Sequence, residues 1–219
     1  MNTIQRYFMK ALASLMLAGL CLCITANANA QCPTDIAPTT GPGSAWAGPI
    51  VGTLLMPGTT DCYVIYHYCQ RIVNAEVQYY IEDFGPYYSS WGTDCHGTLW
   101  YDILNAVKER LFQTTTNVED CGGLHVLTTT SIFSGQCAEM TSSNPIAIFC
   151  GGAYCKKTCD LCYNTTTHQI DETNCSITVV GTASCNSMSD WSTLTVNAVV
   201  ANTWGYNYNQ CYFIDCSGS

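Results

Sequence analysis

Charged residues are scarce in this sequence, and basic residues are the scarcest. Only 11% of the 219 residues are charged, with 7 Lys and Arg against 16 Asp and Glu. Nucleic-acid binding depends on clustered Lys and Arg that displace counterions from phosphates. Here only Lys156 with Lys157, and Lys108 with Arg110, lie close together in the chain. We therefore expect no nucleic-acid partner.

The motifs that mark common enzyme classes are missing as well. The chain has no P-loop, no G-x-G-x-x-G, no G-x-S-x-G nucleophile elbow and no H-E-x-x-H. Each of these motifs places a phosphate cradle, a nucleophile or a metal at a fixed spacing. Their absence excludes the readily recognised nucleotide binders, serine hydrolases and zinc proteases, and we expect no cofactor.

Long apolar runs are missing after the first 30 residues. Residues 1–30 carry Arg6 and Lys10, an apolar run over 11–26, and the small residues Ala28 and Ala30 around Asn29. This order is typical of a signal peptide, and the run is shorter than the roughly 20 residues that span a bilayer. We expect cleavage near Ala30, a secreted, periplasmic or cell-surface location, and no transmembrane anchor in the mature chain.

Cleavage would also change the charge of the protein. Losing Arg6 and Lys10 leaves 5 basic residues against 16 acidic ones, a net charge of −11. A lipoprotein anchored at Cys21 or Cys23 is the alternative, but a leucine precedes each of these cysteines where a small residue is expected.

Cysteine, in contrast, is abundant. Removing Cys21 and Cys23 from the 16 cysteines leaves an even number, which after export predicts seven disulfides whose pairing is left open by the spacing. The expected disulfide cysteines are Cys32, Cys62, Cys69, Cys95, Cys121, Cys137, Cys150, Cys155, Cys159, Cys162, Cys175, Cys185, Cys211 and Cys216.

The densest cluster is the stretch 150–162, C-G-G-A-Y-C-K-K-T-C-D-L-C. We interpret it as a disulfide knot, because thiols oxidise in an exported protein. A tetrathiolate zinc site and a thioredoxin-like Cys159-x-x-Cys162 pair are the alternatives. A zinc signature normally has two separated C-x-x-C knuckles and the mature chain has one, so we expect no metal.

The hydrophobic pattern predicts an α+β fold, mainly antiparallel β, disulfide-rich, with one clear helix at about 99–112. Trp100, Leu104, Val107 and Leu111 form its apolar stripe, Thr98 is a candidate N-cap, and Lys108 and Arg110 suit its C-terminal end. We expect strands over 50–56, 62–73, 76–82, 125–133, 146–150, 176–180 and 193–200, with a turn near Asn74. The expected divisions are a signal peptide (1–30), an extended arm (31–48), an α+β region (49–140) and a cysteine-rich β region (141–219), the last two of which can form one compact domain.

Candidate catalytic residues are few. Asp94 and His96, with Asp102, could carry acid–base chemistry beside two tryptophans, and His125 could join them. The simpler interpretation, which we favour, is a glycine-flanked loop pinned by Cys95. His67 has Tyr63 and Ile65 on its strand face, which indicates a hydrogen-bonded histidine more than a metal ligand.

Aromatic residues could form a binding surface. The candidates are Tyr87, Tyr88, Trp91, Trp204 and Tyr206, and the partners that suit exposed rings are an extracellular protein or a carbohydrate. Ordinary packing of strands is the alternative explanation for these aromatics.

The run Cys159-x-x-Cys162-Tyr-Asn-Thr-Thr-Thr before Cys175, with the 62–95 segment and the A-N-A leader, resembles cysteine-rich exported bacterial proteins of no assigned function. The resemblance implies an exported, disulfide-bonded, strand-rich protein and transfers no functional residue. The sequence thus favours a non-catalytic secreted or surface protein with a binding or structural role. A small secreted hydrolase or metal-dependent enzyme using Asp94 and His96 is the alternative.

Overall fold

The structure is a computed structural model. It describes residues 32–33, 36, 43–87, 95, 97–122, 127–140, 146–183, 185, 187–191, 194–196 and 211–216. Residues 31–219 form one compact unit. Within the described part of the chain, no helix is long and apolar enough to cross a membrane. The leader expected over residues 1–30 lies outside the described residues.

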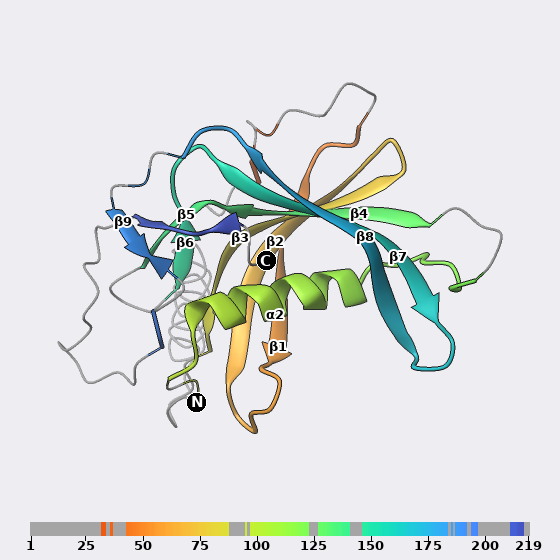
Figure 1. Cartoon of the computed structure of the whole chain (residues 1–219), viewed down its shortest axis with the longest axis horizontal. Helices are drawn as coiled ribbons and strands as arrows, with labels where there is room; N and C mark the ends of the chain where they lie inside the picture. Colours follow the sequence, from red (N-terminus) through yellow and green to blue (C-terminus); the bar gives the residue numbers. More distant parts are fainter. Residues whose placement is uncertain are drawn as a thin grey trace, which may run out of the picture. The chain divides into compact units, whose positions relative to one another are not determined.

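The described residues form one helix and a ten-stranded sheet (Figure 1). The elements are β1 (Ala47–Leu55), β2 (Tyr63–Val73), β3 (Glu76–Pro86), α2 (Trp100–Gln113), β4 (Thr128–Gly135), β5 (Cys137–Met140), β6 (Ala147–Phe149), β7 (Tyr154–Asn164), β8 (Gln169–Val180), β9 (Ser187–Asp190) and β10 (Tyr212–Phe213). The predicted strand-rich fold with one helix is confirmed. The sheet is mainly antiparallel, but β3 pairs with β4, and β9 with β10, in parallel.

β3 organises the sheet because three strands pair with it. Its whole length pairs with β2, which in turn pairs with β1. On its other side, the first half of β3 pairs with β4 and the second half with β6. From β4 the sheet continues through β7 to β8, and from β6 through β5 and β10 to β9. The sheet therefore crosses the division expected near residue 141, and residues 141–145 themselves lie outside the described residues.

The β2–β3 hairpin forms where the sequence predicts it. Asn74 and Ala75 have φ values of 51° and 67°. Two positive φ angles in a two-residue loop are typical of the hairpin turn whose twist matches that of the strands. The predicted turn at Asn74 is thus confirmed, and β3 extends through Gly85 and Pro86 instead of ending at residue 82.

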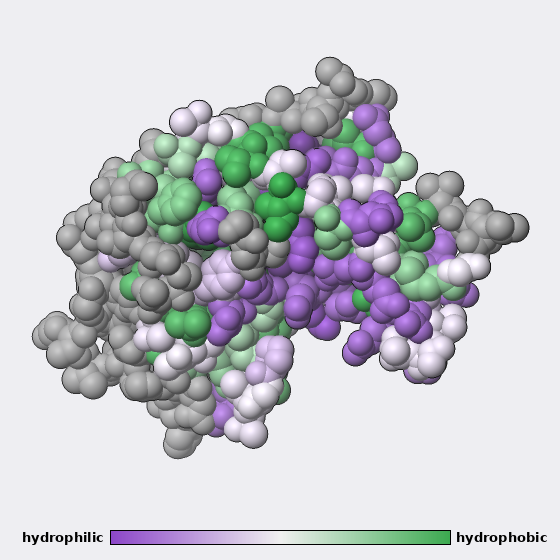
Figure 2. All heavy atoms as spheres, in the orientation of Figure 1, coloured by the Kyte–Doolittle hydropathy of each residue, from purple (hydrophilic) through white to green (hydrophobic). Residues whose placement is uncertain are grey.

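Helix α2 packs its apolar stripe against the inner face of the curled sheet. Trp100, Leu104, Val107 and Leu111 are fully buried, as predicted, together with Phe84 and Ile132 from β3 and β4. Figure 2 shows hydrophilic residues across the middle of the opposite, solvent-facing side, over α2. The helix spans residues 100–113, within one residue of the prediction at each end.

Two predicted details of α2 are wrong. The N-cap is Leu99, which makes no side-chain capping bond, and the Trp100 amide donates instead to the Leu194 carbonyl at 2.9 Å. Lys108 does not reach solvent near the helix end, because its side chain is 2% exposed and lies among the core residues. The basic residue in the last turn is Arg110.

Seven disulfides cross-link the unit, and all fourteen expected cysteines are paired. The pairs are Cys32–Cys69, Cys62–Cys95, Cys121–Cys162, Cys137–Cys185, Cys150–Cys211, Cys155–Cys216 and Cys159–Cys175. The stretch 150–162 is mostly the long strand β7, which the sequence did not predict. Its four cysteines bond to three other segments and not to one another, so the stretch links distant parts of the chain and is not a local knot.

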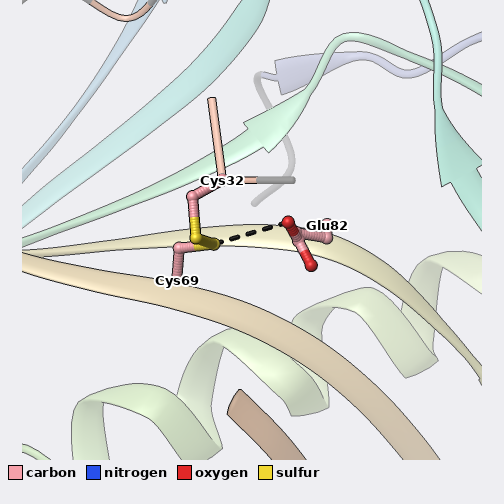
Figure 3. A group of neighbouring side chains, drawn as sticks. All are labelled: Cys32, Cys69 and Glu82. Atoms are coloured by element: carbon pink, nitrogen blue, oxygen red, sulfur yellow. Dashed lines mark hydrogen bonds between the residues drawn. A yellow bond between two sulfur atoms is a disulfide. The ribbon is translucent and has the colours of Figure 1, made fainter. Parts of the chain in front are cut away.

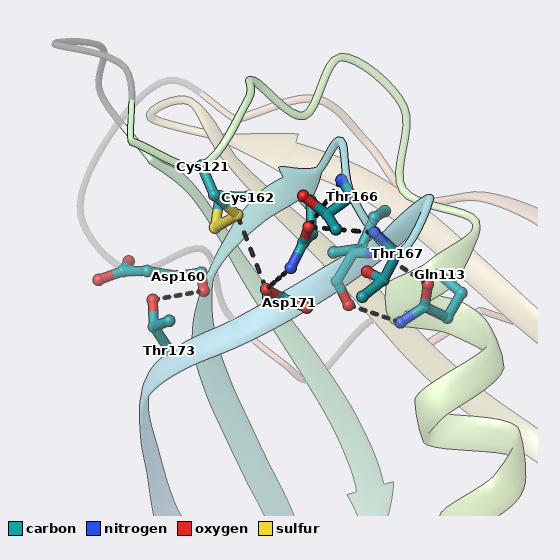
Figure 4. Close-up of a disulfide and its surroundings, with 10 residues drawn as sticks. Gln113, Cys121, Asp160, Cys162, Thr166, Thr167, Asp171 and Thr173 are labelled. Carbon is teal, nitrogen blue, oxygen red and sulfur yellow. Dashed lines mark hydrogen bonds between the residues drawn. A yellow bond between two sulfur atoms is a disulfide. The ribbon is translucent and has the colours of Figure 1, made fainter.

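The end of α2 is fixed to β8 near one of these disulfides (Figure 4). The Gln113 amide donates from Nε2 to the Ile170 carbonyl at 2.8 Å and accepts from the Ile170 amide at 3.0 Å. The nearby Asn164 side chain donates to Asp171 at 2.8 Å. Together with Cys121–Cys162, these bonds hold the β7–β8 hairpin and the helix end in a fixed arrangement.

Candidate functional site

Asp102 is the candidate catalytic residue that the structure describes. It lies exposed in the first turn of α2 and lines a pocket between the helix and the β1–β2 loop. Met56 and Thr59 come from that loop, and Asn105 and Glu109 come from the same side of the helix. Asp102 and Glu109 are two helical turns apart, so their Cα atoms are separated by about 10 Å.

The other predicted catalytic residues cannot be placed in this pocket. Asp94, His96 and His125 lie outside the described residues. Gly97 and Thr98 do line the pocket, so the chain enters it directly after His96. The pocket as described holds two carboxylates and no basic side chain.

Of the five predicted aromatic binding residues, only Tyr87 lies in the described part of the chain. Tyr88, Trp91, Trp204 and Tyr206 lie outside it. Tyr87 directly follows β3, and its side chain is 54% exposed. Its amide donates to the Tyr63 carbonyl at 2.7 Å, so the hairpin ladder continues to this residue and places Tyr63 opposite Tyr87.

Strand pairing extends this pair into a row across three strands. Leu55 of β1 is the register partner of Tyr63, so Leu55, Tyr63 and Tyr87 lie side by side on the outer face of the sheet. Their side chains are 44%, 48% and 54% exposed. Val64 and Tyr66, which alternate with Tyr63 along β2, are buried on the inner face against α2.

Two further rows complete what we call the outer-face platform. The second row is Thr53, Ile65 and Gly85, and the third is Val51, His67 and Asp83. Val51 is 59% exposed. The platform is mainly apolar, with exposed Thr53 in its middle row and a polar pair at one corner. Its residues are Leu55, Tyr63, Tyr87, Thr53, Ile65, Gly85, Val51, His67 and Asp83.

That corner is a hydrogen-bonded histidine–aspartate pair. His67 Nδ1 lies 2.6 Å from Asp83 Oδ1, and the two side chains are 27% and 18% exposed. The hydrogen bond that the His67 ring donates to the Asp83 carboxylate raises the pKa of His67, against the opposing effect of burial. This bond pairs His67 Nδ1 with Asp83 Oδ1, so the two charged groups of the corner face each other beside the apolar rows.

Beyond this corner, described residues of the N-terminal arm, namely Cys32, Ile36 and Trp46, contact β2 and β3. A β-bulge between His67 and Tyr68 shifts the register. Past the bulge, Cys69 bonds to Cys32, and Arg71 donates to the Ile36 carbonyl at 3.3 Å. The Arg71 guanidinium also lies 4.2 Å from the centre of the Trp46 ring. Cys32, Ile36 and Trp46 therefore cover part of the outer face beyond the bulge, while Leu55, Tyr63 and Tyr87 of the platform stay about half exposed.

Glu82 lies beside the Cys32–Cys69 disulfide that tethers the arm (Figure 3). It is 8% exposed, and its Oε1 lies 3.4 Å from the sulfur of Cys69. Its Oε2 is buried and has no hydrogen-bond partner among the described residues. Burial, and then the charge of Asp83, raise the pKa of Glu82, while His67 partly offsets them.

A second carboxylate contacts a disulfide on β7 and β8. Glu172 Oε2 lies 3.6 Å and 3.8 Å from the sulfurs of Cys159 and Cys175. Unlike Glu82, it has a cationic partner, Lys157 Nζ at 3.3 Å. Two sets of three side chains each bring potential metal-ligand atoms within 4.8 Å of one another. They are Cys32, Cys69 and Glu82, and Cys159, Glu172 and Cys175. Either set could bind a metal only after its disulfide is reduced, because thiolates are the ligands.

Sequence reasoning missed most of these residues. Tyr63 and Leu55 were assigned to strands, but nothing in their spacing shows which rows come together on one face. No sequence pattern predicts that Glu82 is buried beside a disulfide, because its position depends on the register shift at the bulge. No family model, no curated protein and no solved structure matches this chain.

Proposed function

We propose that this chain is an exported, disulfide-stabilised protein with a non-catalytic binding role. In this proposal the outer-face platform recognises an extended segment of an extracellular protein. The observation that carries the proposal is the row Leu55, Tyr63 and Tyr87, three large side chains about half exposed and adjacent on three strands. Contiguous exposed apolar groups commonly mark binding sites, and tyrosine is enriched in interfaces.

The sequence and the second edge of β1 favour a protein segment, and not a carbohydrate, as the binding partner. β1 contains no charged residue, and among the described residues it pairs with β2 alone. In the described part of the chain the other edge of β1 has no neighbouring strand, and an extended peptide can add to such an edge as a further strand. The side chains of an added strand would lie beside Val51 and Leu55 and continue the platform.

The disulfides support export. Seven cross-links in one unit of this size are expected where thiols oxidise, as in secreted and periplasmic proteins. Signal-peptide cleavage near Ala30 belongs to the same proposal.

The test uses peptides as probes. Random nine-residue peptides displayed on phage are selected on the oxidised protein, and individual binders are measured by fluorescence anisotropy. We expect the selected peptides to have alternating apolar residues. Their Kd should rise at least about tenfold for the variant Y63S/Y87S, because truncating a buried interface tyrosine typically costs more than about 1 kcal/mol of binding free energy. V51K should weaken binding too, since a lysine on an edge strand opposes strand addition.

Val179 supplies the matched control. It is 51% exposed on β8, away from the platform, so V179S removes a similar exposed apolar group and should leave the Kd unchanged. Selected peptides that bind Y63S/Y87S and V51K as tightly as wild type would contradict the proposal. Binding to chitin or peptidoglycan that Y63S/Y87S abolishes and V51K preserves would make the platform a carbohydrate site instead.

A small secreted hydrolase is the second candidate, and the pocket at the start of α2 favours it. Asp102 would act there with Asp94 and His96, which lie outside the described residues. This candidate predicts that D102N lowers the hydrolysis of chromogenic ester, phosphate or glycoside substrates about 100-fold without changing Tm. D120N, which alters an exposed aspartate outside the pocket, is the control. Equal rates for D102N and D120N would remove the hydrolase and leave the binding role.

A further inference from the structure

The disulfide that tethers the N-terminal arm joins a partly exposed cysteine to a fully buried one, a pattern it shares with pairs such as Cys159–Cys175. Cys32 is partly exposed at the start of the arm, while Cys69 is fully buried in β2. An external thiolate can therefore approach the sulfur of Cys32 and not that of Cys69. Attack at one sulfur expels the other, so Cys69 is the leaving group.

The expelled sulfur lies against a carboxyl group suited to protonating it. Cys69 Sγ is 3.4 Å from Glu82 Oε1 (Figure 3). Neither sulfur of a disulfide carries hydrogen, so a proton shared across this contact belongs to Glu82. Glu82 is 8% exposed, and its Oε2 has no hydrogen-bond partner in the described part of the chain. Such burial disfavours the charged carboxylate and favours the protonated form.

We propose that Cys32–Cys69 is an exchange-reactive disulfide that forms a mixed disulfide with an external thiol at Cys32, with Glu82 as the proton donor to Cys69. The thiolate forms a bond to Cys32 Sγ, the Cys32–Cys69 bond breaks, and its electron pair remains on Cys69 Sγ. Glu82 then transfers its proton to that sulfur and becomes a carboxylate. In the reverse direction Glu82 recovers the proton, and Cys69 expels the bound thiol.

This site is independent of the binding proposed for the platform. It depends on the arm disulfide and Glu82, and it would remain if no peptide bound. Its consequence is that the protein can be joined covalently to a partner thiol through Cys32, the residue that also tethers the arm.

The experiment follows exchange directly. The oxidised protein is incubated with 2-mercaptoethanol, quenched with acid, alkylated and mapped by mass spectrometry. We expect the mixed disulfide on Cys32, with Cys69 alkylated, to form before either cysteine of the fully buried pair Cys62–Cys95 reacts. The rate for E82Q should be roughly 10- to 100-fold lower at pH 6, because glutamine cannot donate a proton as an acid.

The pH dependence distinguishes a proton donor from a packing residue. The titratable groups that face Glu82 are Asp83 on β3 and His67 on β2. Once Glu82 ionises at higher pH it has no proton to give, and its charge opposes the thiolate. The ratio of wild-type to E82Q rates should therefore fall towards 1 or below by pH 9, and using the ratio cancels the titration of the reagent.

Glu172 provides the control because it also contacts a disulfide but is paired with Lys157. E172Q should leave exchange at Cys32–Cys69 unchanged. Equal rates for wild type and E82Q at every pH would overturn the role of Glu82. No adduct on Cys32, or an adduct there that forms no sooner than one on Cys62 or Cys95, would overturn the reactive disulfide itself.

Discussion

Lys108 lies on the buried side of α2, one turn after Leu104 and one turn before Phe112. Its side chain is 2% exposed, and burial lowers its pKa to about 7, with a further contribution from the charge of Lys157. The sequence suggested a lysine serving the C-terminal end of the helix. The geometry instead places an amine in the core, where the charged form is disfavoured.

We expect K108M to stabilise the protein at low pH. The methionine keeps the length of the side chain and removes the buried charge. Each pKa unit corresponds to about 1.4 kcal/mol, so the free energy of unfolding should rise by roughly 2–4 kcal/mol at pH 6. Guanidinium unfolding of the oxidised protein, followed by tryptophan fluorescence, measures this change.

The gain should shrink as the pH rises. Between about pH 7 and pH 10.4 the unfolded chain binds a proton at Lys108 that the folded chain does not, so the wild-type stability increases with pH over this interval. The difference between K108M and wild type should therefore fall towards zero near pH 10. E109Q, which removes an exposed charge from the next residue, should show no such trend. A constant difference from pH 6 to pH 10 would contradict a buried titrating amine.

Single residues of the candidate sites were only partly predictable. Tyr87 was identified from sequence as one member of a cluster of aromatic residues, and the structure describes it as exposed. Tyr63 lay within a strand pattern, and alternation alone does not say which face of a strand is open. Glu82 is buried because of one register shift beside His67, and no sequence pattern encodes that shift.

Among the elements, those with strong local signals were predicted. The stripe of α2 and the Asn74 turn each follow from periodicity and turn chemistry over a few residues. β7 was missed because its cysteines and lysines, as in Cys155-Lys156-Lys157, do not alternate between apolar and polar. This segment is a strand because of its long-range pairing: β7 lies between β4 and β8 and forms backbone hydrogen bonds with both.

The parallel pairing of β3 with β4 also depends on distant contacts. The two strands are separated in sequence by α2, which crosses the inner face of the sheet before the chain returns. A crossover of this kind is how parallel neighbours are usually joined. The hydrophobic pattern of each strand is the same for either direction, so the sequence favoured the commoner antiparallel arrangement.

At the scale of the whole molecule, the pairing of the cysteines follows the fold. An even count predicts that they pair, but partners are chosen by which segments the sheet brings together. Cys155 and Cys159 lie on β7, and their partners are Cys216 near the chain end and Cys175 in the next strand. One bridge therefore closes a long loop and the other a short hairpin.

These two bridges should stabilise the molecule to different extents. Cys155–Cys216 spans 61 residues and Cys159–Cys175 spans 16. Loop-closure entropy gives about 4 kcal/mol for the long loop and about 3 kcal/mol for the short one. The long bridge also holds the segment with Tyr212 and Ile214, which pack in the core near Trp191.

We therefore expect C155A/C216A to lower the free energy of unfolding more than C159A/C175A does. Guanidinium unfolding followed by tryptophan fluorescence compares the variants, and C155A/C216A should also shift the native emission to longer wavelength as Trp191 becomes more hydrated. In C159A/C175A the β7–β8 ladder keeps the two strands together, so the native spectrum should match wild type. An equal or larger loss in C159A/C175A would show that local strain or edge protection, and not loop length, sets what each disulfide contributes.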